Sequence, residues 1–179
     1  MDADDISQII FLLILLALSA FFSSSETALT TVNKIRMRTL AEAGNTKAKK
    51  VLKVTENSPK MLSAILIGNN IVNLSASSLT TSLAIKLFGS VGAGVATGIL
   101  TFLILIFGEV SPKTLATIKA DKISLSIAGF ISVLMVVLTP VIYIINKLSL
   151  GVILLFRIRQ SDANRVMTQE VLRTVVDVG

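Results

Sequence analysis

The sequence has no cysteine, no histidine and no tryptophan, and charged residues make up only 16% of its 179 positions. The absence of cysteine excludes disulfide bonds, thiolate metal sites and a cysteine nucleophile. The absence of histidine excludes an imidazole general base and a zinc site of the usual kind. A serine nucleophile needs a basic partner, and no lysine lies in an apolar segment near the serines at residues 23–25. We therefore expect that the protein is not an enzyme.

Apolar residues, in contrast, are abundant. An ordinary soluble domain is about a quarter charged, whereas this chain is 53% hydrophobic and has a mean hydropathy of +0.80. This composition indicates an all-α integral membrane protein. The net charge is +6, but the basic residues flank long apolar runs. That placement is typical of the positive-inside rule and not of nucleic-acid binding.

Three apolar segments are predicted to cross the membrane as helices, at residues 6–32, 61–88 and 93–107. An uncharged turn at residues 89–92 separates the second segment from the third. A secretory signal peptide begins with positive charge, whereas this chain begins with three aspartates, so the first segment is predicted to be retained. Acidic residues before it and basic residues after it place the N-terminus outside and the C-terminus in the cytoplasm.

A basic stretch follows the first predicted crossing. Residues 34–60 contain eight lysines and arginines and two glutamates, with apolar residues interspersed. Gly44 and Asn45 divide the stretch into two pieces. We expect two juxtamembrane helices on the cytoplasmic surface of the membrane; the alternative is a solvated, charged loop.

The last apolar block, residues 123–158, contains Pro140 and has basic residues at both ends. Basic ends require an even number of crossings or none, and the block is slightly short for two full spans of about 20 residues each plus a turn. We expect a proline-broken pair of helices, re-entrant or interfacial; the alternative is a fourth span. Residues 160–179 are polar with amphipathic spacing. We expect a membrane domain at residues 1–159 and a linker to a soluble domain at 160–179.

Polar residues interrupt each predicted crossing, and such residues are costly in a membrane and therefore informative. In the first segment, the hydroxyls of Ser19 and Ser23 are four residues apart and lie on one helix face. In the second segment, the amides of Asn69 and Asn73 have the same spacing. In the third, Pro112 lacks the N–H that would bond the carbonyl of Gly108. Three polar clusters result: Ser19 and Ser23, extended by Ser24, Ser25 and Glu26; Asn69, Asn70 and Asn73; and Gly108 with Glu109.

These groups offer only oxygen atoms from hydroxyls, amides, carboxylates and a backbone carbonyl. Oxygen ligands suit Mg²⁺, Ca²⁺ or Na⁺, and the lack of histidine and cysteine argues against Zn²⁺ and Cu²⁺. Secondary transporters use broken helices with exposed carbonyls to coordinate cations in this way. Taken together, the three clusters predict a cation site between the first three helices.

Each cluster also has a structural interpretation. Serine hydroxyls in membrane helices often bond to their own turn or hold helices together. Glu109 could form an ordinary helix pair with Lys113. For Glu26, a pair with Lys34 or Arg36 is favoured over ligation of the ion. Small residues also recur every fourth position in the third segment, which is either a homodimer contact or packing within the chain. These small residues are Ser90, Gly94 and Gly98.

Three motifs, read in order, resemble the transmembrane domain of the CorC/CNNM family of magnesium transporters. They are AFFSSSETAL at residues 20–29, GNNIVN at 68–73 and GEVSPK at 108–113. The resemblance covers about residues 6–159. It implies a homodimer with three crossings per protomer, a basic juxtamembrane belt, and Mg²⁺ export coupled to Na⁺ entry. It also implies cytosolic paired CBS domains after the linker. By the same resemblance, the family's ion site falls on Ser19, Ser23, Asn69, Asn70, Asn73, Gly108 and Glu109.

The expected function is therefore Mg²⁺ export across the plasma or inner membrane, with Mg²⁺ and Na⁺ as the ions bound. Two alternatives stay open from the sequence. The chain could be a non-transporting membrane anchor that presents cytosolic regulatory domains, with its polar clusters acting only between helices. It could also carry another ion, such as Co²⁺ or Na⁺ alone.

Overall fold

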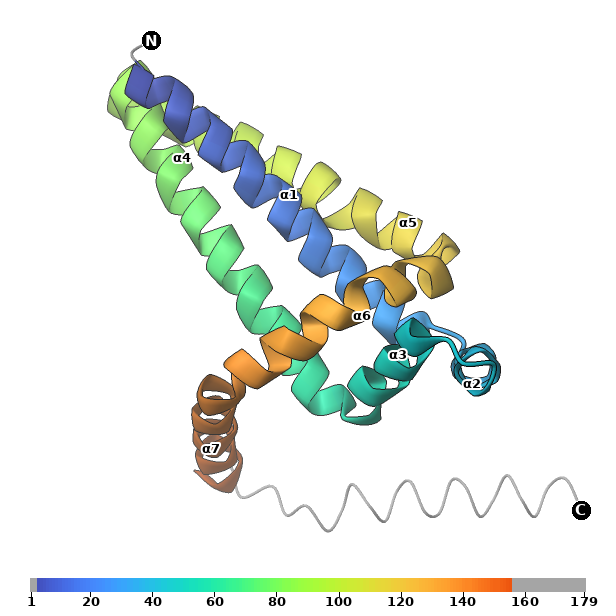
Figure 1. Cartoon of the computed structure of the whole chain (residues 1–179). Helices are drawn as coiled ribbons and strands as arrows, with labels where there is room; N and C mark the ends of the chain where they lie inside the picture. Colours follow the sequence, from blue (N-terminus) through green and yellow to red (C-terminus); the bar gives the residue numbers. More distant parts are fainter. Residues whose placement is uncertain (1–2, 156–179) are drawn as a thin grey trace, which may run out of the picture. The chain divides into compact units, whose positions relative to one another are not determined.

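The computed structural model describes residues 3–155, which are helical apart from short connections (Figure 1). The described residues fall into two units, one ending at Thr139 and one beginning at Pro140, and each is described by itself. The predicted all-α class is confirmed. The elements are α1 (Ala3–Thr31), α2 (Lys34–Glu42), α3 (Thr46–Glu56), α4 (Ser58–Leu103), the π-helix η1 (Ile104–Val110), α5 (Ser111–Ile118), α6 (Ala120–Val137) and α7 (Thr139–Leu155).

Helix α4 consists of two arms that meet at Gly89. The backbone of Gly89 has φ 71° and ψ −178°, which is not helical and is a φ that side-chain-bearing residues rarely adopt. The chain reverses there, and the second arm continues through η1 into α5. Helix α1 contacts both arms (Figure 1). The predicted turn at residues 89–92 is confirmed.

Among the described residues, four helices are long and apolar enough to cross a membrane, so the chain is a multi-pass membrane protein. Three of them, Asp4–Thr31, Ser58–Gly89 and Gly92–Ile118, correspond to the predicted crossings. The fourth is Ala120–Val137, in the block for which interfacial helices were preferred to a fourth span. Figure 1 shows that α6 crosses α1 at a large angle, whereas the other three run along one another.

The first arm of α4 packs closely against α1 at Gly68. A Cβ added to Gly68 would lie 2.6 Å from Cζ of Phe22, so the aromatic ring occupies the space that any larger residue would need. Phe22 is buried. Gly68 therefore sets the distance between α1 and α4 one residue before Asn69.

Replacement of Gly68 by alanine is expected to lower the stability of the protein by about 1–3 kcal/mol, because the buried ring of Phe22 must move. Gly129→Ala on α6 is the matched control, since the nearest atom to a Cβ there is Nζ of Lys50 at 3.9 Å, an ordinary van der Waals distance. Thermal unfolding of both variants in detergent measures the difference. Equal melting temperatures for the two variants would show that α1 and α4 do not depend on this contact.

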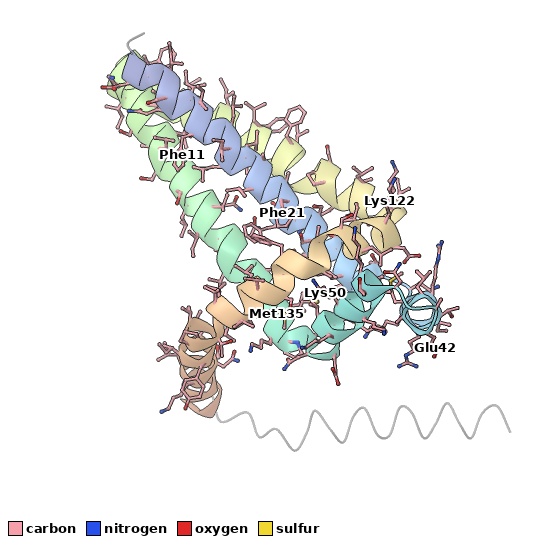
Figure 2. The ribbon with its side chains drawn as sticks, viewed as in Figure 1. Phe11, Phe21, Glu42, Lys50, Lys122 and Met135 are labelled. Carbon is pink, nitrogen blue, oxygen red and sulfur yellow. The ribbon has the colours of Figure 1, made fainter. Side chains whose placement is uncertain are left out.

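Two short helices, α2 and α3, fill the basic stretch, as predicted. Each has an asparagine N-cap: Asn33 Oδ1 accepts from Arg36 N–H, and Asn45 Oδ1 accepts from Lys47 N–H. Gly44, with φ 92°, forms the turn between them. Helix α3 packs against α6. Figure 2 shows Glu42, Lys50 and Lys122 near α2, α3 and the start of α6, whereas Phe11 lies toward the other end of α1.

The last apolar block is broken into two helices, as predicted. Helix α6 ends at Val137, and α7 begins at Thr139, so Pro140 lies in the first turn of α7, where a missing N–H costs least. In the first unit, α6 contacts α1 through the rings of Phe130 and Phe21, which meet edge to face with centroids 5.1 Å apart. The predicted linker at 160–179 lies outside the described residues.

Candidate cation site

Ser19 on α1 joins the first two polar clusters. Its side chain is buried, and its Oγ donates a hydrogen bond of 2.8 Å to Oδ1 of Asn73. The same Oγ lies 3.5 Å from Oδ1 of Asn69. Because Asn69 and Asn73 are four residues apart on α4, both amides face α1. The structure therefore brings three of the seven predicted residues together.

Ser23 lies one turn farther along α1 and is 1% exposed. Among the described residues its Oγ has no hydrogen-bond partner. The neighbouring serines differ: Ser24 and Ser25 both donate to the carbonyl of Phe21, at 2.9 and 2.6 Å. A buried hydroxyl without a partner costs about 1–3 kcal/mol. The described part of the chain therefore leaves the Ser23 hydroxyl available to another group.

The π-helix η1 brings its backbone against Ser19. Gly108 is buried in η1, and a Cβ at this position would lie 3.1 Å from Oγ of Ser19. Ser111 N–H donates to the carbonyl of Ile106, five residues back. Since Pro112 has no N–H, the carbonyl of Gly108 lacks its α-helical donor. The sequence predicted a distortion here from Pro112 but not the π turn, a feature frequent at functional sites.

Glu109 and Glu26 share one lysine. Nζ of Lys113 lies 3.3 Å from Oε1 of Glu109 and 3.6 Å from Oε2 of Glu26. The pair of Glu109 with Lys113, which the sequence offered as the structural alternative to ion binding, is present. The predicted pairing of Glu26 with Lys34 or Arg36 is wrong, because α5 returns alongside α1 and brings Lys113 to Glu26.

Arg36 has a different carboxylate partner. Its Nη1 lies 3.0 Å from Oδ2 of Asp121 at the start of α6. Oδ1 of the same aspartate accepts a hydrogen bond of 3.2 Å from Asn33 N–H. Asp121 therefore connects the start of α2 to the start of α6.

Asn70 takes no part in the hydrogen bonds that join Ser19 to Asn69 and Asn73. It is exposed, and it follows Asn69 by one position, about 100° around the helix. Of the small residues in the second arm, Gly94 and Gly98 are exposed, and a Cβ at either would have no atom within 4 Å. These two glycines do not pack against the described part of the chain.

The site as a whole is a set of oxygen atoms at the contact of α1, α4 and η1. The described residues contain no cluster of three histidine, cysteine, aspartate or glutamate side chains that could hold a metal. The ligands on offer are neutral oxygens and the carboxylate of Glu109. Mg²⁺ commonly binds one or two carboxylates and retains several of its waters, and this set can supply that kind of coordination.

Comparison with known proteins agrees with the motifs. The sequence profile of the Cyclin M transmembrane N-terminal domain, CNNM, matches residues 9–179. The chain belongs to the CNNM family. The resemblance to CorC/CNNM proteins noted from the three motifs is thereby confirmed.

Relatives of this CNNM domain include proteins of two bacteria. A UPF0053 protein of Haemophilus influenzae is 39% identical over 177 residues, covering 98% of this chain and 42% of the relative. The UPF0053 inner membrane protein YfjD of Escherichia coli is 36% identical over 160 residues, covering 89% and 37%. The polyamine export protein of Escherichia coli is 25% identical over 202 residues, covering 97% and 42%. The CNNM chain thus spans about two fifths of the length of these relatives.

Proposed function

We propose that this domain binds Mg²⁺ between α1, α4 and η1 and transports it across the membrane. The observation that carries the proposal is the buried Ser23 hydroxyl, which lacks a partner among the described residues and lies one turn from the Ser19–Asn73 hydrogen bond. The ligands are drawn from Ser19, Ser23, Asn69, Asn70, Asn73, Gly108 and Glu109. A bound cation would satisfy the Ser23 hydroxyl and the carbonyl of Gly108, and Glu109 would neutralise part of its charge.

The finer features of the proposal come from charge patterning and from the family resemblance. We infer three crossings, an outside N-terminus and an inner- or plasma-membrane location, and the crosswise course of α6 in Figure 1 supports placing α6 at the interface. Export of Mg²⁺ coupled to Na⁺ entry, a homodimer and regulation by cytosolic CBS domains follow from the resemblance. The exposed glycines at positions 94 and 98 are consistent with a contact to a second protomer.

A second candidate cargo is an organic polycation. One relative is named as a polyamine export protein. In the structure, an alkylammonium group, Nζ of Lys113, already lies between the carboxylates of Glu26 and Glu109. The same two carboxylates could therefore receive an ammonium group of a polyamine.

The test is thermal unfolding of the purified protein in detergent, titrated separately with Mg²⁺, Ca²⁺ and spermidine. A ligand that binds only the folded state stabilises it by about 2.7 kcal/mol at a hundredfold excess over its dissociation constant. We expect a Mg²⁺-selective increase that Ser23→Ala abolishes. Because the Ser23 hydroxyl has no partner among the described residues, Ser23→Ala should not lower the melting temperature measured without ions.

Ser24→Ala is the matched control, because Ser24 is adjacent but bonded to its own helix turn. It should keep the Mg²⁺ effect. Asn70→Ala tests a residue that belongs to the family motif but is exposed in the structure. Loss of the Mg²⁺ effect in this variant would show that Asn70 is a ligand. If Mg²⁺ raised the melting temperatures of Ser23→Ala and Ser24→Ala equally, the assignment of Ser23 as a ligand would be contradicted. A response to spermidine alone would favour the polyamine, and no response to any cation would favour a membrane anchor.

A further inference from the structure

A triad of charged side chains, Glu26, Lys113 and Glu109, borders the candidate site. The three residues come from α1, α5 and η1, and Nζ of Lys113 lies between the carboxylates, 3.3 Å from Glu109 and 3.6 Å from Glu26. All three side chains are between 28% and 43% exposed. One ammonium therefore partly neutralises two carboxylates, and neither carboxylate has it exclusively.

The position of Lys113 conflicts with binding of a cation at Glu109. An ion held by Glu109 would lie within a few ångströms of the ammonium, and like charges at that distance repel strongly where water does not screen them. The carboxylate of Glu109 can therefore fully compensate the charge of Lys113 or that of the ion, but not both. Glu26 gives the ammonium a second place, because Nζ is already within ion-pair distance of it.

We propose that Lys113 is a tethered cation that competes with Mg²⁺ for Glu109, and that Glu26 receives the ammonium when Mg²⁺ binds. This inference rests on the proposed function. In the empty site, Lys113 compensates the charge of Glu109. In the occupied site, the ammonium shifts to Glu26, and its return to Glu109 helps to expel the ion.

The exchange has a physical use in a transporter. Conduction and transport require binding that is favourable enough for the ion to enter but weak enough for it to leave. A competitor attached to the chain has a fixed, high local concentration, so it lowers the affinity of the site for every incoming ion. Lys113 would then set the balance between occupancy and release.

Mg²⁺ affinity measured by calorimetric titration of the purified protein tests the proposal with four variants. Lys113→Met should bind Mg²⁺ at least tenfold more tightly than the wild type, and Lys113→Arg, which keeps the charge, should not. Glu26→Gln should bind Mg²⁺ more weakly, because the ammonium then has only Glu109. The double variant Lys113→Met/Glu26→Gln should bind as tightly as Lys113→Met alone.

The control is Lys119→Met, which makes the same charge change at an exposed position six residues farther on and should leave affinity within about twofold. The double-mutant cycle distinguishes exchange from general electrostatics, since independent charge effects add. Weakening by Glu26→Gln that persists without Lys113 would make Glu26 a direct ligand and overturn the exchange. If Lys113→Met left the Mg²⁺ affinity unchanged and lowered the melting temperature, the triad would only stabilise the fold, and the exchange would be contradicted. Absence of Mg²⁺ binding to the wild type would instead overturn the proposed function as well.

Discussion

Glu109→Gln is expected to abolish Mg²⁺ binding and transport while leaving the protein folded. Glu109 is the only carboxylate among the seven proposed ligand residues, and glutamine keeps its shape while removing its charge. Unit charges about 4 Å apart interact by about 4 kcal/mol at an effective dielectric constant of about 20. Each 1.4 kcal/mol is about a factor of ten in affinity, so we expect the dissociation constant for Mg²⁺ to rise on the order of a hundredfold or more.

The folded state should tolerate Glu109→Gln because the side chain is 43% exposed, and Lys113 retains Glu26 as a partner. The measurements are the Mg²⁺-dependent shift in melting temperature and Mg²⁺ flux into liposomes that contain the protein. Glu56→Gln, an exposed carboxylate at the end of α3, is the matched control for loss of one negative charge. Wild-type flux through Glu109→Gln would show that the ion does not depend on this carboxylate.

Ile131→Ala is expected to have the largest effect on stability, about 2–5 kcal/mol. Ile131 lies on α6 and is fully buried. Helix α6 contacts α1, α3, α4 and α5, so removal of this side chain leaves a cavity inside the first unit. Such truncations cost the transfer free energy of the lost atoms plus a term for the cavity.

Val133→Ala on the same helix is the comparison, because Val133 is 63% exposed. Its cost should be small. Thermal unfolding of both variants in detergent gives the difference. If Ile131→Ala were as mild as Val133→Ala, α6 would be a separate helix that contributes little to the first unit, as a fourth independent span would be.

The features that the sequence predicted correctly are local. The start of α3 after Gly44–Asn45, the reversal at Gly89 and the helix break before Pro140 each depend on one or two residues with restricted backbone or capping chemistry. The extents of the first two apolar helices follow from long runs of hydrophobic residues, whereas the third continues to Ile118, beyond the predicted end at residue 107. The Glu109–Lys113 pair follows from its spacing along one helical stretch.

The features that the sequence did not predict depend on contacts between distant segments. Spacing alone could not tell which of the neighbouring amides at positions 69 and 70 faces Ser19, and the packing of Phe22 on Gly68 helps to decide this. Glu26 is nearer in sequence to Lys34 than to Lys113, yet the return of α5 along α1 selects Lys113. The crosswise course of α6 likewise reflects its contacts with α1 and α3 and not its apolar composition.

The π turn in η1 affects the alignment of this sequence with those of its relatives. Its hydrogen bonds close over five residues instead of four, so the helix accommodates one residue more than an α-helix of the same course. A relative that lacks the turn would align with a one-residue gap between Ile104 and Val110 and still reach Pro112 in register. A gap at that position would therefore record the gain or loss of the bend that brings Gly108 to Ser19, and would not be an alignment error.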